Sequence, residues 1–141
     1  MQTFVPYTNN AKSAQVLDRQ RLGKQRVEVL QILRALAGET KGWVNHPATK
    51  MWRGHELALI EYGLAVCEEW VSRGYKDTCA DRIRGYREVF SRDTAKMPSW
   101  WRGAIHMSHR SNLVRKRPDI YGELWRDVDP DAPYVWPVPT S

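Results

Sequence analysis

The stretch DRQRLGKQRVEVLQILRALAG, residues 18–38, decides the fold because its apolar residues recur at helical spacing. One stripe of this stretch carries the apolar side chains Leu22, Val29, Leu33 and Leu36. Asp18 is a residue type that caps helix starts, and Gly38 is a type that ends helices. The pattern therefore predicts a long amphipathic helix from Arg19 to Ala37, with one stripe facing the core.

The rest of the chain predicts further helices and no convincing strand ladder. Pro47 fits the first turn of a second helix that runs to Arg73, and shorter helices are predicted over residues 79–91 and 104–116. Further turns are expected near Asn9 and Asn10 and over residues 119–126. We predict an all-α fold, in which residues 1–141 form one compact bundle of three to four main helices. It carries an extended N-terminal arm (residues 1–8) and a Pro-rich, extended C-terminal tail (residues 129–141).

Composition narrows the classes of function. The chain has 141 residues, 42% of them hydrophobic, and a formal net charge of +6, which favours a polyanionic partner over a neutral one. Its two cysteines, Cys67 and Cys79, argue against a thiolate zinc cage and a disulfide framework, so a reducing cytoplasm is expected. No signal peptide, membrane span or membrane partner is expected. The seven Trp suit either a packed core or stacking on bases.

The second face of the first helix holds the most suggestive polar residues. It carries Gln20, Arg21, Lys24, Glu28 and Gln31, with Arg26 near the same end. A helix N-terminus with these cations favours phosphate. Glu28 could form an ordinary surface ion pair with Lys24 one turn earlier. A carboxylate within a phosphate-binding face is repelled by DNA, however, so a catalytic role is the alternative.

The second group of candidate DNA-binding residues lies on the helix at residues 104–116. It comprises His106, His109, Arg110, Arg115 and Lys116, and the preferred interpretation is contact with phosphate or base. A solvated basic helix end remains an alternative, and a metal site would need a third ligand that no motif supplies. In the loop at residues 38–46, Lys41 is a further candidate. His46 either caps the second helix or contacts DNA, whereas His55 is expected in the core beside Trp52 and Leu59.

Three segments, taken in order, resemble the pyrimidine-dimer DNA glycosylase family, the small helical endonuclease V type. The first is Leu17-Asp18-Arg19-Gln20-Arg21-Leu22, which is followed six residues later by Glu28. The second is Thr40-Lys41-Gly42-Trp43-Val44-Asn45-His46-Pro47, and the third runs from His106 to Tyr121 with its ending Arg117-Pro118-Asp119-Ile120-Tyr121. Arg73-Gly74-Tyr75 also fits.

The resemblance implies an all-α fold and an enzyme that flips a nucleotide and cleaves its glycosidic bond with an N-terminal α-amine. It implies a Schiff base, strand cleavage at the abasic site and, by match, Glu28 as the catalytic carboxylate. No metal or organic cofactor is implied. An α-amine has an ordinary pKa of about 7.7–8.0, so it is a better nucleophile at neutral pH than a lysine. Nearby cations are expected to keep Glu28 ionised.

The sequence departs from the family pattern in places that concern the nucleophile. Gln2 is too large for the usual removal of Met1, so the reactive amine is expected to be that of Met1. The family's Arg before the catalytic Glu is Val27 here, and Arg21 replaces a family His. Lys24 is a possible substitute amine.

The expected function is therefore a DNA glycosylase, with AP-lyase activity, that excises damaged or modified pyrimidines. Its expected partner is duplex DNA with a damaged or modified base. A monomer is expected, located in the cytoplasm and associated with the nucleoid if the source is bacterial. The alternatives are a hydrolytic, monofunctional glycosylase for another altered base, and a non-catalytic nucleic-acid-binding helical module.

Overall fold

The computed structural model describes residues 2–93 and 96–137, and over these ranges the chain is helical without a strand. The helices are α1 (Asn10–Val16), α2 (Arg19–Leu36), α3 (Pro47–Lys50), α4 (Glu56–Ser72), α5 (Ala80–Val89), the 3-10 helix η1 (Ser99–Arg102), α6 (Ile105–Lys116) and α7 (Pro118–Tyr121). The predicted all-α fold is confirmed. Within these ranges, no helix has the length and apolar character that crossing a membrane requires.

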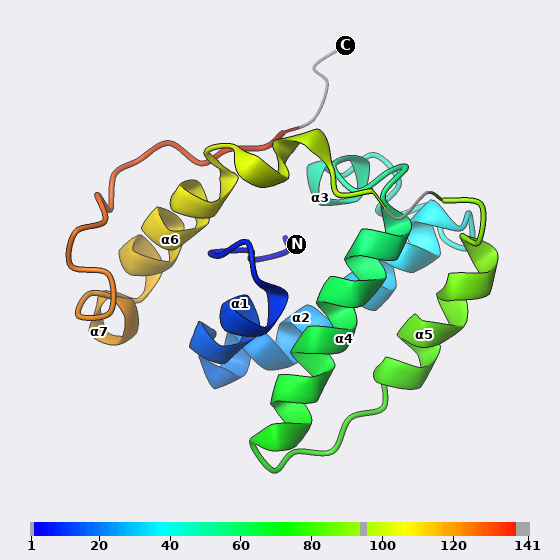
Figure 1. Cartoon of the computed structure of the whole chain (residues 1–141), viewed down its shortest axis with the longest axis horizontal. Coiled ribbons are helices and arrows are strands. Elements are labelled where there is room, and N and C mark those ends of the chain that lie inside the picture. Colours follow the sequence, from blue (N-terminus) through cyan, green and yellow to red (C-terminus); the bar gives the residue numbers. More distant parts are fainter. Residues whose placement is uncertain (1, 94–95, 138–141) are drawn as a thin grey trace.

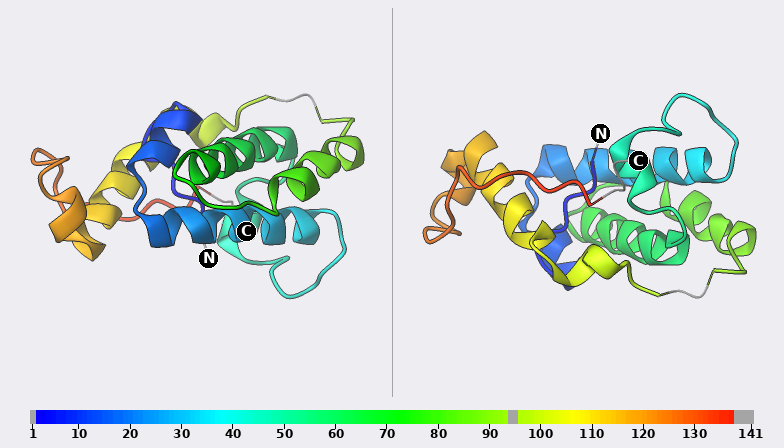
Figure 2. Two further views of the ribbon diagram at one scale, coloured as in Figure 1. Left: turned by 90° about the horizontal axis from the view of Figure 1, so that it is seen from below. Right: turned by 90° about the horizontal axis from the view of Figure 1, so that it is seen from above.

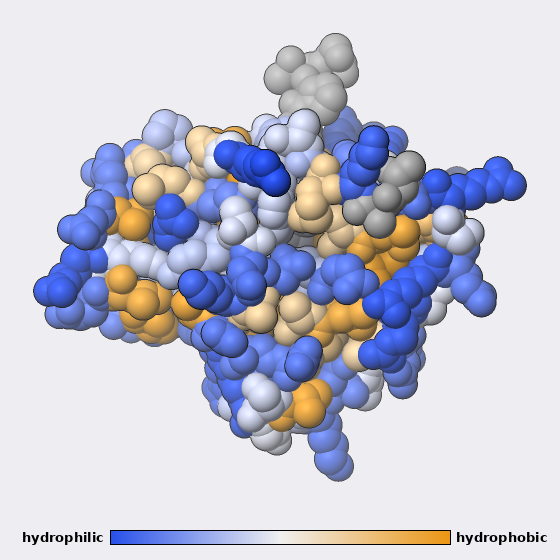
Figure 3. All heavy atoms as spheres, viewed as in Figure 1, coloured by the Kyte–Doolittle hydropathy of each residue, from blue (hydrophilic) through white to orange (hydrophobic). Residues whose placement is uncertain are grey.

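Helices α2 and α4 form the centre of the bundle, and α1 and α5 pack against α4 (Figure 1). Helix α6 lies apart from them, and the N-terminal arm passes between α6 and the α2–α4 pair (Figures 1 and 2). The tail returns from α7 alongside α6 toward the N-terminus (Figure 1). In the space-filling view, apolar residues form separate patches among hydrophilic ones (Figure 3).

The long helix follows the sequence prediction closely. Asp18 caps α2 by accepting a hydrogen bond from the backbone N–H of Arg21 at 3.4 Å, and the helix ends one residue before Ala37. Its stripe is buried through Leu22, Val29 and Leu33, whereas Leu36 is only partly buried against the core. Burial of such a stripe is what stabilises a helix of this length in water.

The predicted helix over residues 47–73 is interrupted, which corrects two expectations. Gly54 has a backbone φ of +85°, a conformation that residues other than glycine rarely adopt, and the turn at Gly54 separates α3 from α4. His55 consequently sits at the start of α4, partly exposed, with its Nδ1 3.0 Å from the carbonyl oxygen of Lys96. The expectation of a core histidine at His55 is therefore wrong.

The arm is extended, as predicted, and residues 3–6 are buried. Buried backbone groups must find hydrogen-bond partners, and here side chains of the helices provide them. The N–H of Phe4 donates to Gln25 Oε1 (2.8 Å), and its carbonyl accepts from the Tyr62 hydroxyl (2.6 Å). The next residue, Val5, is held by two histidines of α6: its N–H donates to His109 Nδ1 at 2.9 Å, and its carbonyl lies 2.6 Å from His106 Nδ1.

These contacts correct the interpretation of His106 and His109 as DNA-binding residues. Their side chains are 7% and 1% exposed and are bonded to the arm. Arg110 follows the same pattern, because its Nη1 donates to the carbonyl of Pro6 at 2.6 Å. Three of the five α6 residues that the sequence assigned to DNA, His106, His109 and Arg110, therefore hold the N-terminal arm.

A close approach between α2 and α4 predicts the effect of a single methyl group. A Cβ added at Gly63 would lie 2.6 Å from Val29 Cγ1, far inside van der Waals contact, and both residues are in the core. We expect Gly63→Ala to lower the free energy of unfolding by about 1–3 kcal/mol, measured by urea denaturation. In the double variant with Val29→Ala, the total loss of unfolding free energy should be smaller than the sum of the losses in the two single variants. Strictly additive losses would contradict this packing.

The second prediction concerns pH. Burial, together with the charge of His106, lowers the pKa of His109 from 6.5 to about 3, so the folded protein keeps the ring neutral with Nδ1 accepting from Val5. Between pH 6.5 and about 3 the unfolded chain binds this proton and the folded chain does not. The free energy of unfolding should therefore fall as pH falls through this window, by at most about 1.4 kcal/mol per unit.

His109→Asn is the matched variant, because an amide oxygen accepts from Val5 without titrating. Urea denaturation at pH 7.5, 6.5 and 5.5 should show a shallower pH dependence for His109→Asn than for the unsubstituted protein. Parallel pH dependences of the two proteins would show that His109 does not carry the effect.

Candidate active site

A pocket of about 290 Å³ lies where the arm crosses the first half of α2. It is lined by Gln2 and Phe4 of the arm, by Lys116 at the end of α6, and by five side chains of α2, namely Gln20, Arg21, Lys24, Gln25 and Glu28. Residues three and four positions apart share a helix face, which is why α2 presents these side chains together. The structure thus brings together five of the residues that the sequence singled out: Gln20, Arg21, Lys24, Glu28 and Lys116.

Among the described residues that line this pocket, Glu28 is the only carboxylate, and the residue is 8% exposed. Its Oε2 accepts from Gln25 Nε2 at 2.8 Å and from the backbone N–H of Gln2 at 3.5 Å. Burial raises the pKa of Glu28, although the bond from Gln2 and the charge of Lys24 oppose the shift. The direction is opposite to the lowering that nearby cations would cause by themselves, and the burial argues against a wet surface ion pair.

Three cations surround the carboxylate from two helices. Arg21 and Lys24 come from α2, and Lys116 comes from α6. Burial lowers the pKa of Lys116, and the neighbouring charges of Arg21, Arg115 and Lys24 lower it further. Like charges held this close repel one another, so an anion that enters the pocket relieves the repulsion. The arrangement is suited to a phosphate group beside Glu28.

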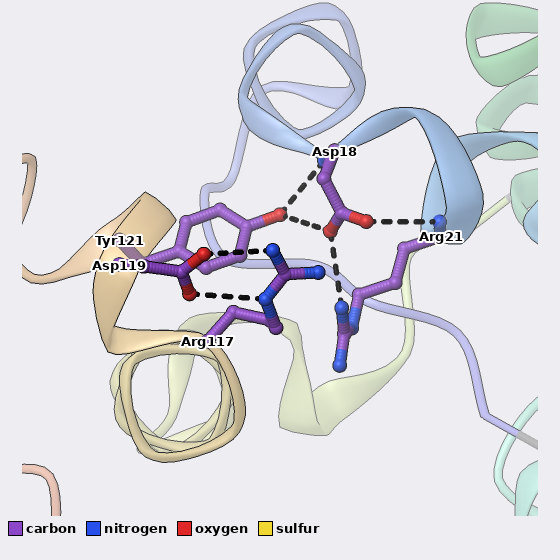
Figure 4. Close-up of polar contacts among 5 residues, drawn as sticks. All are labelled: Asp18, Arg21, Arg117, Asp119 and Tyr121. Carbon is purple, nitrogen blue, oxygen red and sulfur yellow. Dashed lines mark hydrogen bonds and ion pairs between the residues drawn. The ribbon is translucent and has the colours of Figure 1, made fainter.

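Asp18 links the start of α2 to α7 by hydrogen bonds and thereby positions Arg21, one of the cations that line the pocket (Figure 4). Its Oδ1 accepts from the Tyr121 hydroxyl at 2.7 Å and from Arg21 Nη1 at 3.2 Å, and its N–H donates to the same hydroxyl at 2.8 Å. Burial opposes ionisation, but the bonds from Tyr121 and Arg21 prevail and lower the pKa of Asp18. Arg117 forms a separate bidentate pair with Asp119 beside this group (Figure 4).

The other predicted DNA-binding residues do not line the pocket. Arg26 is paired with Asp77 at 2.6 Å and lies over the Trp70 ring, while Arg115 donates to the carbonyl of Pro130. His46 accepts from the N–H of Ala48, as expected of a helix cap. Lys41 is exposed in the loop between α2 and α3. Of the basic residues assigned to DNA on α6 and in the loop before α3, only Lys116 is among the residues that line the pocket.

Gln2, Phe4 and Gln25 also line this pocket, although the sequence patterns did not single them out as site residues. A signal for Gln25 did exist, because it lies three residues after Leu22 and four before Val29, on the buried stripe of α2. A polar residue on an apolar stripe requires internal partners. Tyr134 of the tail, whose hydroxyl donates to Gln2 Oε1, gave no such signal.

Comparison with known proteins identifies a family for this chain. The family described as pyrimidine dimer DNA glycosylase matches residues 1–83. The matched range contains the arm, α2 and every pocket-lining residue except Lys116. No curated protein and no solved structure matches the chain. Within residues 2–93 and 96–137, no group of three or more His, Cys, Asp or Glu could hold a metal ion.

The position of Lys116 in the pocket predicts that this lysine contacts a DNA phosphate. Each phosphate contact contributes about one unit to the slope of log affinity against log salt. We expect Lys116→Gln to weaken binding to all duplex sequences and to reduce that slope by about 1, measured by fluorescence anisotropy. Lys76→Gln, at an exposed lysine between α4 and α5, is the matched control and should change neither. Equal losses in both variants would argue against a phosphate contact at the pocket.

Proposed function

Because the chain belongs to the pyrimidine dimer DNA glycosylase family, we propose that it excises damaged or modified pyrimidines from duplex DNA by an amine Schiff-base mechanism assisted by Glu28. DNA glycosylase activity and a DNA substrate follow from the family. The AP-lyase step, the amine and the role of Glu28 are the finer parts of the proposal.

One contact gives the main support for an amine that acts together with Glu28. The backbone N–H of Gln2 donates to Glu28 Oε2, so the nitrogen that bonds covalently to Met1 lies against the buried carboxylate. Met1 itself is outside the described residues. Covalent geometry limits its α-amine to one residue's length from this nitrogen, about 3.8 Å between consecutive Cα atoms. This supports an amine and a carboxylate acting on one nucleotide.

The proposed reaction begins with the neutral amine forming a bond to C1′ of a flipped nucleotide while the glycosidic bond breaks. The base leaves with the electron pair and takes up a proton. The amine nitrogen loses a proton and the sugar ring opens, with O4′ gaining a proton, to give a Schiff base. Glu28, in its ionised form, stabilises the positive charge and accepts the proton from C2′, and the 3′ phosphate then leaves.

The surrounding cations suit this chemistry. Arg21, Lys24 and Lys116 would hold the phosphates that flank the reacting sugar. Lys24 lines the same pocket and is the second candidate for the nucleophile. A lysine must lose its proton from an ordinary pKa near 10.4, whereas an α-amine does so near 7.7–8.0, which favours Met1.

The test of Glu28 is its isosteric amide. Glu28→Gln preserves the acceptor and shape but removes the charge, so it should bind duplex DNA as well as the unsubstituted protein or better. Its single-turnover rate on lesion-containing duplex should fall by about 10²–10⁴-fold. Full activity of Glu28→Gln would contradict the assigned role.

The nucleophile is tested by blocking the N-terminus. Acetylation, or one added N-terminal residue, should abolish borohydride trapping on an abasic duplex. Trapping that survives the block but disappears in Lys24→Gln would assign the amine to Lys24. Base release without trapping would instead indicate a hydrolytic glycosylase, and neither base release nor trapping would indicate a non-catalytic DNA-binding module.

A further inference from the structure

The side chain of Gln25 is 1% exposed and joins the arm to Glu28 through a set of hydrogen bonds. Its Nε2 donates to the carbonyl of Gln2 and to Glu28 Oε2, both at 2.8 Å. Its Oε1 accepts from the N–H of Phe4 at 2.8 Å and from the Tyr62 hydroxyl at 2.6 Å. An amide offers two donor hydrogens and two acceptor sites; both hydrogens are used, and one acceptor site shares the single Tyr62 hydroxyl hydrogen with the carbonyl of Phe4.

The surroundings fix which end of the amide points where. The N–H of Phe4 can only donate, so it requires the oxygen of Gln25 on its side. The nitrogen must then face Gln2 and Glu28, both of which present oxygen acceptors. The two donor hydrogens of one rigid, planar group therefore point at the two partners that flank the proposed chemistry.

The rest of the arm does not depend on Gln25 for its place. Val5 is bonded to His109 and His106, Pro6 to Arg110, and the Gln2 side chain to Tyr134. Loss of the Gln25 amide would leave the arm docked between α6 and the α2–α4 pair. What would be lost is the bridge through Gln25, so that the 3.5 Å bond from the Gln2 N–H would be the remaining contact between Gln2 and Glu28.

We propose that Gln25 is a positioning residue, which sets the separation between Glu28 and Gln2. Gln2 is covalently bonded to Met1, whose α-amine is the proposed nucleophile. The inference rests on the proposed function and deepens it. It assigns to Gln25 no contact with DNA. Misplacing a reacting group by about 1 Å can cost on the order of 10²-fold in rate, so such a clamp would be visible in kinetics.

The test is Gln25→Met, which keeps the volume and removes all four hydrogen bonds. Affinity for a duplex with an uncleavable abasic analogue should stay within about twofold, since no phosphate contact changes. The single-turnover rate of borohydride trapping on an abasic duplex should fall by about 10–100-fold. Gln31→Met, the same substitution six residues further along α2 and outside the pocket, is the control and should trap at the original rate.

The pH profile separates positioning from loss of structure. Gln25 donates to Glu28, and removal of this bond raises the pKa of the carboxyl further, so the acid limb of the trapping rate should move to higher pH in Gln25→Met. Among the described residues, the other charged or titratable groups near Glu28 are Arg21 and Lys24 of α2, Lys116 of α6, Tyr62 of α4 and Tyr134 of the tail, and they stay unchanged. Partial unfolding would lower the amplitude of trapping without moving the limb.

Gln25→Glu gives a second, independent measurement. Its carboxylate can still accept from Phe4 and Tyr62, so the arm stays anchored, but in its ionised form it cannot donate to Gln2 or Glu28. Slow trapping with intact binding and a displaced acid limb supports the proposal. Trapping at the original rate in both Gln25 variants would overturn it while leaving the glycosylase intact. Absence of trapping and base release by the unsubstituted protein would instead overturn the proposed function.

Discussion

The structure depends on how the buried backbone of arm residues 3–6 is satisfied. An extended segment in a helical protein has no neighbouring strand to bond with, and unpaired buried N–H and C=O groups are costly. Side chains solve the problem here: Gln25 from α2, Tyr62 from α4, and His106, His109 and Arg110 from α6 contact the arm backbone. Three helices are thereby held around one segment, and residues 3–6 lie buried between them.

The same solution explains why polar groups cluster at the pocket. Glu28 is buried because the arm covers it, and Gln25 partners it because that amide already bonds the arm. A buried carboxylate without donors or nearby cations would be strongly disfavoured. Lys24, Arg21 and Lys116 line the same pocket. The groups proposed for chemistry and the groups that hold the fold are therefore one connected network.

Several residues that looked functional in the sequence turn out to do structural work, for an identifiable reason. His106 and His109 recur on one side of a basic helix, and that pattern suits a DNA-facing surface as well as a buried contact. Arg26 has the same ambiguity, and the structure pairs it with Asp77, 51 positions away. The partner that decides each role is distant along the chain, and local spacing carries no information about it.

The sequence by itself determined the helical class, the bounds and cap of α2, the polar face with Glu28, and the family of the chain. These follow from local periodicity, capping chemistry and ordered motifs, which are readable within a few turns of chain. Only the tertiary structure decided that His55 leaves the core, that α6 holds the arm, and that Gln25 links the arm to Glu28. Those outcomes depend on long-range packing, because a buried polar group takes whichever partner the fold brings within hydrogen-bonding distance.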